Sequence, residues 1–276
     1  KYWMALTGLF LCLFLVGHLI GNLQIIYADP HQFNTYALFM TSNIAVKALS
    51  YLTYLSILFH TVDGILLTVQ NAKARPVGYV RNNPSKNSTW SSRNMGILGT
   101  LILIFIVTHM MNFWAVMHFD NKMPLETFFV ENPMGGKQEF YVTQTPGEYI
   151  PKDQVAASKK EAEAQRKPLF IKDRTEFMYV QADVKKADGY KDLYKVTVAF
   201  FKDEKFGLIA TVLYVLAMVA LGFHLYHGFA SAFQSLGANH PKYSPAISKF
   251  GIAFSIIVPL LFAIIPVFVR FFLKTV

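Results

Sequence analysis

The chain has 276 residues, of which 53% are hydrophobic and 16% charged, and it carries a formal net charge of +9. Its one cysteine, Cys12, excludes a disulfide within the chain and an iron–sulfur cluster held by the chain's own cysteines. Segment 119–205 holds equal numbers of acidic and basic residues. The excess positive charge therefore lies in short loops elsewhere and does not indicate a nucleic-acid partner.

Long stretches without Asp, Glu, Lys or Arg dominate the sequence, and a helix of such length crosses a hydrocarbon core of about 30 Å at ~1.5 Å per residue. The charge-free stretches are 2–28, 94–119, 206–241 and 250–269, and a fifth apolar stretch, 48–69, is broken only by Asp63. The predicted fold is an all-α membrane protein with a five-helix transmembrane bundle. The predicted helices cover 2–27, 47–71, 94–118, 206–234 and 246–272.

A long hydrophilic segment separates the third and fourth predicted helices. This gives three regions: transmembrane helices 1 to 3 in 1–118, an insertion in 119–205, and helices 4 and 5 in 206–276. Gly/Pro turns, an expected helix near 153–167 and an aromatic apolar stretch at 177–180 favour an ordered cap, although a flexible loop is the alternative.

The short loops indicate the orientation of the bundle. Loop 72–93 contains five basic residues and no acid, and loop 235–249 contains Lys242 and Lys249 and no acid. Short basic loops stay on the cytoplasmic side, whereas a long segment such as 119–205 is translocated regardless of its charge. We therefore expect a bacterial inner membrane protein with its N-terminus inside, its C-terminus outside and 119–205 on the external, periplasmic side.

Four histidines, His18, His60, His109 and His224, lie in four different apolar stretches. Ionisable residues are rare in membrane spans and usually mark a site. By helical rise and orientation, His18 and His109 belong to the outer half of the membrane, and His60 and His224 lie lower. The pattern predicts two bis-histidine haems, one held by His18 with His109 and one held by His60 with His224.

Alternative roles exist for these side chains. A membrane histidine can also hydrogen-bond a neighbouring helix or relay protons. His227 follows His224 by three residues and either replaces it as ligand or donates a hydrogen bond at the haem edge. Gly17, Gly21, Gly222 and Gly228 flank two of the ligands, where they either admit a flat macrocycle or allow tight helix packing.

Three segments resemble a known family. They are Met4-Ala5-Leu6-Thr7-Gly8 leading to His18-Leu19-Ile20-Gly21-Asn22, then Asp63-Gly64 with Ala74-Arg75-Pro76-Val77-Gly78-Tyr79, and His224-Leu225-Tyr226-His227-Gly228-Phe229. In order and spacing over all five helices, the chain resembles the di-haem cytochrome b membrane-anchor subunit of succinate:quinone oxidoreductases, the respiratory Complex II enzymes of the tricarboxylic acid cycle and of fumarate reduction.

The resemblance implies a function in electron transport. Members of this family hold two haem b groups, anchor a flavoprotein subunit and an iron–sulfur subunit on the cytoplasmic face, and exchange electrons with a quinone, usually menaquinone in di-haem forms. The dicarboxylate chemistry then takes place on another chain. One departure is that Gly222 and Phe223 precede His224, where some di-haem fumarate reductases carry a proton-conducting glutamate.

Further candidate residues lie at the two ends of the bundle. On the inner side, Arg75 and Tyr79, with Lys1, Trp3, Arg81, Trp90 and Arg93, are expected donors to the haem carboxylates, or simply a solvated basic surface. Asp63 is expected to form a structural pair near this side. On the outer side, Asn22 and Lys47 are the expected quinone ligands among a polar group that also contains Gln24, Tyr27, Asn43, Asn112 and Trp114, which interfacial or capping roles would equally explain.

Two other functional classes remain open. The haem anchor of another quinone-linked dehydrogenase, such as a hydrogenase or formate dehydrogenase, also uses histidine-ligated haems. A transporter would use the histidines as proton relays. The order of one histidine per helix over helices 1 to 4 and the Ala-Arg-Pro segment favour the Complex II family.

Overall fold

The computed structural model of the chain describes residues 1–74, 76–77, 83–131 and 135–274, and 67% of the structure is helical. The chain forms two compact units. The helical unit contains residues 1–27, 43–109 and 200–276, and the mixed unit contains residues 28–42 and 110–199.

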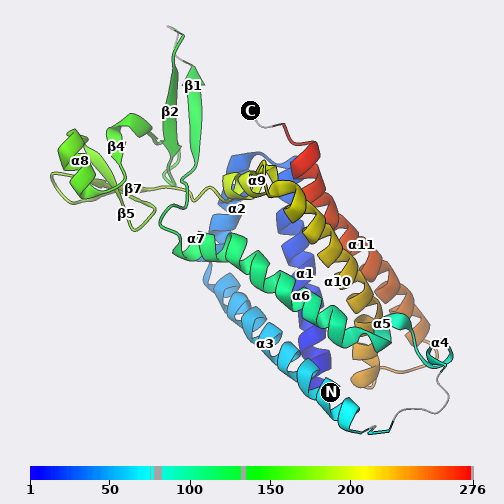
Figure 1. Cartoon of the computed structure of the whole chain (residues 1–276). Coiled ribbons are helices and arrows are strands. Elements are labelled where there is room, and N and C mark those ends of the chain that lie inside the picture. Colours follow the sequence, from blue (N-terminus) through cyan, green and yellow to red (C-terminus); the bar gives the residue numbers. More distant parts are fainter. Residues whose placement is uncertain (75, 78–82, 132–134, 275–276) are drawn as a thin grey trace. The chain divides into compact units, whose positions relative to one another are not determined.

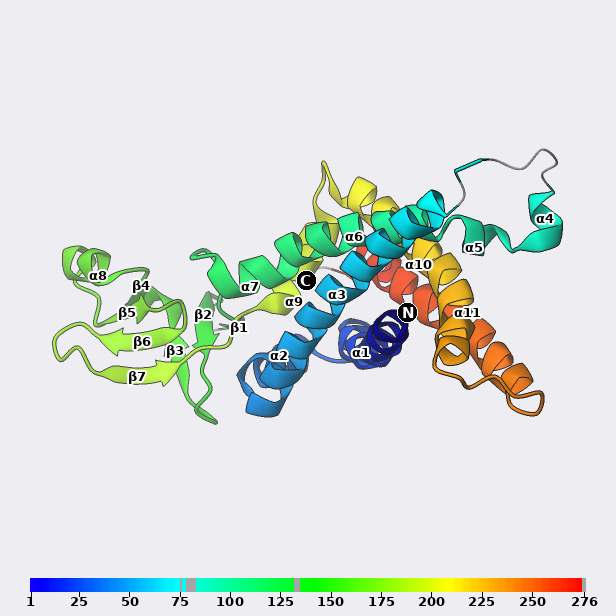
Figure 2. The same ribbon diagram turned by 90° about the horizontal axis from the view of Figure 1, so that it is seen from below.

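Five helices are long and apolar enough to cross a membrane, which confirms the predicted helices and is compatible with membrane localisation. The long helices of the helical unit run side by side and in alternating directions along the chain (Figures 1 and 2). They are α1 (Tyr2–Tyr27), α3 (Ile44–Lys73), α6 (Met95–His109), α10 (Gly207–Ser235) and α11 (Ser244–Phe271), with the short helices α4 (Pro84–Asn87) and α5 (Trp90–Arg93) before α6.

The third candidate span continues beyond α6. A π-helix (Met110–Trp114) and α7 (Ala115–Phe119) follow it, so the apolar helical stretch covers 95–119. The π-helix begins directly after His109. A π-helical turn inserts one extra residue into the helical repeat and is often found at functional sites.

Helix α3 begins at Ile44 because Asn43 caps it. The Asn43 side-chain oxygen accepts hydrogen bonds from the backbone N–H groups of Ala45 and Val46 at 2.9 and 3.3 Å. An asparagine in this position satisfies donors that have no partner within the helix. This capping role is sufficient to explain why an asparagine occupies position 43.

Large apolar side chains cover the outer surface of these helices. Leu13 on α1, Leu58 on α3 and Leu213 on α10 are 69%, 56% and 58% exposed. Such surfaces are unfavourable in water and ordinary in lipid. Along each helix the backbone groups bond within the helix, as a span in hydrocarbon requires.

The mixed unit contains two small sheets. The first has the antiparallel order β1-β2-β3, and the second has the order β4-β5-β6-β7, in which only β4 and β5 are parallel. The strands are β1 (Thr127–Glu131), β2 (Lys137–Val142), β3 (Tyr149–Pro151), β4 (Val155–Ala156), β5 (Leu169–Lys172), β6 (Glu176–Tyr179) and β7 (Lys185–Asp188). The remaining elements are α2 (Pro30–Ser42), a 3-10 turn (Lys152–Gln154), α8 (Lys159–Gln165) and α9 (Leu193–Lys202), whose last turn belongs to the helical unit.

The expectation of an all-α protein is therefore wrong for segment 119–205, whose described residues contain all seven of these strands. The segment buries apolar side chains in a core that includes Ile150 and Phe177, which are 1% and 0% exposed. This core argues against a flexible loop. The helix expected near 153–167 is limited to α8, which Ser158 caps by accepting a hydrogen bond from the Glu161 N–H.

Candidate functional site

Two histidines from α1 and α6 lie together in the helical unit. The ring centroids of His18 and His109 are 5.8 Å apart, and the ring planes are perpendicular. Phe14 stacks on His18, and Phe105 stacks on His109, with centroid distances of 5.3 and 5.5 Å. Phe262 of α11 lies 5.8 Å from the His18 ring. An aromatic apolar shell thus surrounds this first pair.

The other two histidines, from α3 and α10, form a second pair. The ring centroids of His60 and His224 are 6.1 Å apart, with an angle of 65° between the planes. The structure thus brings together the same residues that depth in the membrane predicted as partners. His227 is half-buried one turn further along α10, and the ring next to His60 is that of His224.

The ring nitrogens of these histidines have different surroundings. The Thr7 hydroxyl lies 3.2 Å from His60 Nδ1, and the Tyr214 hydroxyl lies 3.4 Å from His109 Nδ1. Among the described residues, His224 Nδ1 is buried without a hydrogen-bond partner. A buried polar atom of this kind requires an explanation, and a ligand in the bundle interior is one.

The spacing of each pair suits a metal that needs two axial nitrogens. An imidazole nitrogen binds a metal at about 2 Å, and the ring centre lies about 1 Å behind it, so two imidazoles on one iron have centres ~6 Å apart. Within the described part of the chain, no group of three or more His, Cys, Asp or Glu side chains could hold a metal ion. Each pair offers two imidazoles, so a metal held there would take its remaining ligands from another group, as the macrocycle of a haem would supply them.

The glycines near the ligands have separate explanations. A Cβ atom at Gly222 would lie 3.1 Å from the Ser255 carbonyl oxygen, so Gly222 allows α10 to pack closely on α11. Cβ atoms at Gly17 and Gly228 would meet nothing within 4 Å, which leaves open space at both positions. Helix packing accounts for Gly222, whereas Gly17 is exposed and Gly228 partly exposed, so neither touches a neighbouring helix at its Cβ position.

Several residues predicted for the inner end of the bundle cannot be placed. Arg75, Tyr79 and Arg81 lie outside the described residues. Of the others, Trp90 packs edge-on against Phe223 of α10 at 5.3 Å. Arg93 donates a hydrogen bond to the Ser88 carbonyl oxygen. The donors to haem carboxylates therefore stay a prediction.

The residues predicted to bind quinone are partly engaged elsewhere. The Asn22 side-chain amide donates to the His18 carbonyl oxygen at 2.7 Å and lies 3.4 Å from both ring nitrogens of His18. Lys47 is exposed near the beginning of α3, and Gln24 is buried. Asn112 belongs to the mixed unit, so the structure does not place it beside the others.

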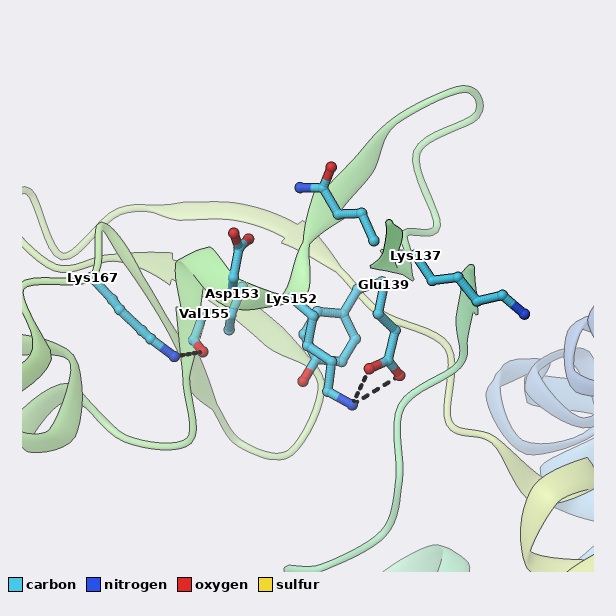
Figure 3. A pocket seen from close by; sticks show the side chains of 8 residues that line it. Lys137, Glu139, Lys152, Asp153, Val155 and Lys167 are labelled. Carbon is cyan, nitrogen blue, oxygen red and sulfur yellow. Dashed lines mark hydrogen bonds and ion pairs between the residues drawn. The ribbon is translucent and has the colours of Figure 1, made fainter. Parts of the chain in front are cut away.

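A hollow of about 450 Å³ in the mixed unit is a separate candidate site (Figure 3). Each of its three lysines has a partner. Lys152 forms an ion pair with Glu139 at 2.8 Å, Lys167 donates to the Val155 carbonyl oxygen, and Lys137 lies 3.9 Å from Glu131. The hollow also contains Glu139 and Asp153, and Lys152 is paired with Glu139, so its lining does not favour an anion.

Sequence reasoning missed two side chains next to the ligands, Thr7 and Tyr214. Thr7 lies in the segment that carried the family resemblance, but no pattern related it to His60, which is 53 residues away. Tyr214 lies ten residues before His224 on α10 and contacts His109 from another helix. Neither contact has a local sequence signal.

Comparison of the chain with family models, with curated proteins and with solved structures finds no match. The arrangement of the histidines is therefore the main basis for a functional proposal.

Proposed function

We propose that this chain is the di-haem b membrane subunit of a succinate:quinone oxidoreductase. The observation that carries the proposal is the pair of histidine pairs, with ring centres 5.8 and 6.1 Å apart on four different apolar helices. Four histidines placed in pairs at this spacing are more than helix packing requires. Two bis-histidine haems explain all four at once.

The fit of the residues to haem rests on three features. The ring spacing matches axial ligation, the first pair is surrounded by aromatic side chains, and one ring nitrogen of the second pair is buried without a partner among the described residues. When bound, haem b supplies one-electron transfer. The chain's own residues hold the ligands in place and exclude water from them.

The proposed partners are a flavoprotein subunit and an iron–sulfur subunit on the cytoplasmic side. Lys73 ends α3 and Lys242 follows α10, and the alternating directions of the helices place these two helix ends at the same end of the helical unit (Figure 1). With the N-terminus inside, this end faces the cytoplasm of a bacterial cell. Electrons would enter near His60 and His224 and leave near His18 and His109.

The proposed electron acceptor is a quinone, most simply menaquinone, in a crevice near the His18–His109 pair. Lys47 is exposed and carries a cation suited to a quinone oxygen. Asn22 lies beside His18 but already donates to the His18 carbonyl oxygen. Lys47 is therefore the stronger of the two candidates.

The alternatives are the haem anchor of a different quinone-linked dehydrogenase and a proton-relaying transporter. The anchor of a different dehydrogenase needs the same histidine pairs, so only the identity of its partner subunits distinguishes it from a Complex II anchor. The second needs histidines in contact with a water-filled path. The aromatic shell around His18 and His109 favours a redox role over a hydrated path.

The test is purification of the chain with its natural partners from membranes. We expect a reduced-minus-oxidised spectrum of low-spin haem b, two haems per chain, and co-purification of a flavoprotein with succinate-dependent dye reduction. Crosslinks from Lys73 or Lys242 to the iron–sulfur subunit would support the docking face. A colourless protein would contradict the haem proposal, and a coloured one that binds a hydrogenase or formate dehydrogenase would establish the alternative anchor.

A further inference from the structure

The Thr7 side chain on α1 contacts the ring of His60 on α3. The Thr7 hydroxyl oxygen lies 2.7 Å from the Trp3 carbonyl oxygen and 3.2 Å from that of Met4, so its single proton is donated within α1. The same oxygen lies 3.2 Å from His60 Nδ1. Because the shorter bond to the Trp3 carbonyl oxygen takes the single hydroxyl proton, Thr7 acts toward His60 as an acceptor, and the Met4 backbone also hydrogen-bonds the His60 ring.

An acceptor at Nδ1 selects one tautomer of the imidazole. The proton of neutral His60 then lies on Nδ1, and the lone pair lies on Nε2. Nε2 is thereby available to a metal, in the arrangement in which a ligating histidine donates its other N–H to a fixed acceptor. Thr7 is buried, with 6% of its surface exposed, so water does not compete well for this bond.

The neighbouring Gly8 provides space for the ring. A Cβ atom at Gly8 would lie 3.2 Å from His60 Cε1 and 3.6 Å from Nδ1, so even an alanine there would press on the imidazole. The two adjacent residues thus have complementary effects. Gly8 lets α1 approach the ring, and Thr7 holds the ring by its Nδ1 proton.

We infer that Thr7 is a positioning residue for the haem that His60 and His224 would hold, and that it tunes the redox potential of this haem. The inference rests on the proposed function. A ligand imidazole that donates its Nδ1 proton becomes more basic and favours the ferric state. Among the described residues, the Nδ1 atom of His224 has no such acceptor, so Thr7 distinguishes the two ligands of one haem.

The experiment compares Thr7→Val with Thr7→Ser in the intact complex. Valine has the shape of threonine without the acceptor, and serine keeps the hydroxyl. Thr100→Val is the matched control, because the exposed Thr100 hydroxyl makes an equivalent bond to the Gly96 carbonyl oxygen on α6. Potentiometric titration followed by optical and low-spin ferric resonance spectra gives the potential and ligand field of each haem.

In Thr7→Val we expect the His60–His224 haem to favour the ferrous state about tenfold more, a positive shift of about 59 mV for one electron. The other haem keeps its potential, and Thr7→Ser and Thr100→Val resemble the parent. Loss of this one haem in Thr7→Val with retention in Thr7→Ser supports the same conclusion. Unchanged potentials in Thr7→Val, or an equal change in Thr7→Ser, overturn the inference. A parent complex with no haem instead overturns the proposed function.

Discussion

The two units of this chain bury their side chains in different ways. In the mixed unit, Phe177 and Ile150 are almost completely enclosed by apolar neighbours. In the helical unit, only 11% of the most apolar window of α3 is buried, and Leu58 is 56% exposed. The mixed unit has the core of a protein folded in water. The helical unit instead leaves its apolar faces exposed, which is unfavourable in water and compatible with membrane-spanning helices.

Polar groups inside the two units differ as well. The mixed unit buries two carboxylates, Glu126 and Asp192, which share the amide of Asn34 at 3.1 and 3.0 Å. The helical unit contains histidines and hydroxyls in its interior. A buried carboxylate needs hydrogen-bond donors, and Asn34 supplies them to both Glu126 and Asp192 in the mixed unit.

The largest expected effect is on the two haems proposed for the helical unit. His109→Ala removes one of the two imidazoles of the first pair, so we expect loss of the haem that His18 and His109 would hold and retention of the other. Haem content per chain and the low-spin ferric spectrum measure this. His118→Ala is the control, since the His118 ring bonds to the Trp114 carbonyl oxygen in the mixed unit. If His109→Ala and His60→Ala removed the same haem, the pairing would be wrong.

The next effect concerns apolar burial. Phe177→Ala should destabilise the mixed unit by about 3–5 kcal/mol, because it creates a cavity in a closed core. Leu58→Ala, on the exposed face of α3, should change the stability of the detergent-solubilised protein by only about 0.5 kcal/mol. Limited proteolysis at increasing urea concentration measures the stability of each variant. Equal sensitivity of the two variants would remove the distinction between the units.

A smaller effect is expected at the buried carboxylates. Asn34→Ala withdraws the amide that bonds to Glu126 and Asp192 and also the acceptor of the Tyr194 N–H. Unsatisfied buried groups cost about 1–3 kcal/mol, so the mixed unit should lose that much stability. Thr41→Val on the same helix removes only a hydroxyl that donates within the helix to the Ala37 and Leu38 carbonyl oxygens, and it should cost less. Similar losses in both would mean that the shared amide has no special role.

The smallest effect is a pH dependence of the mixed unit. Burial raises the pKa of Glu126, and hydrogen bonds from Asn34 and His31 only partly offset this. The folded state therefore holds this proton more tightly than the unfolded chain. The contribution of the protonated Glu126 side chain to stability is therefore present below the ordinary carboxyl pKa, and it is lost as the pH rises through the pKa of the folded state.

Glu126→Gln should remove this loss, so the stability of the variant relative to the parent should increase with pH across the carboxyl range. Thermal unfolding measured at several pH values tests this, in a His31→Gln background because the His31 ring also bonds to Glu126. A constant difference between the two proteins would mean that burial does not perturb this carboxyl.

Much of the helical unit could be predicted from the sequence. Charge-free stretches of sufficient length predict helices in lipid, because composition and rise per residue are local properties. The positions of His18 and His60 along their helices also followed from counting residues. The predicted helix ends were less accurate. The expected helix 47–71 begins at Ile44 in the structure, because the start of α3 depends on the side chain of Asn43 rather than on hydrophobicity.

The strands of segment 119–205 and the partners of the buried side chains could not be predicted in the same way. Asn34 bonds to Asp192 across 158 residues, and Thr7 bonds to His60 across 53. The position of Gly222 beside His224 in the sequence is compatible with room for a cofactor, whereas in the structure the Ser255 carbonyl oxygen lies 3.1 Å from where its Cβ would be. Local sequence determines where helices form because their hydrogen bonds connect residues four apart. Contacts between distant residues depend on how the whole chain packs, and only the tertiary structure decides them.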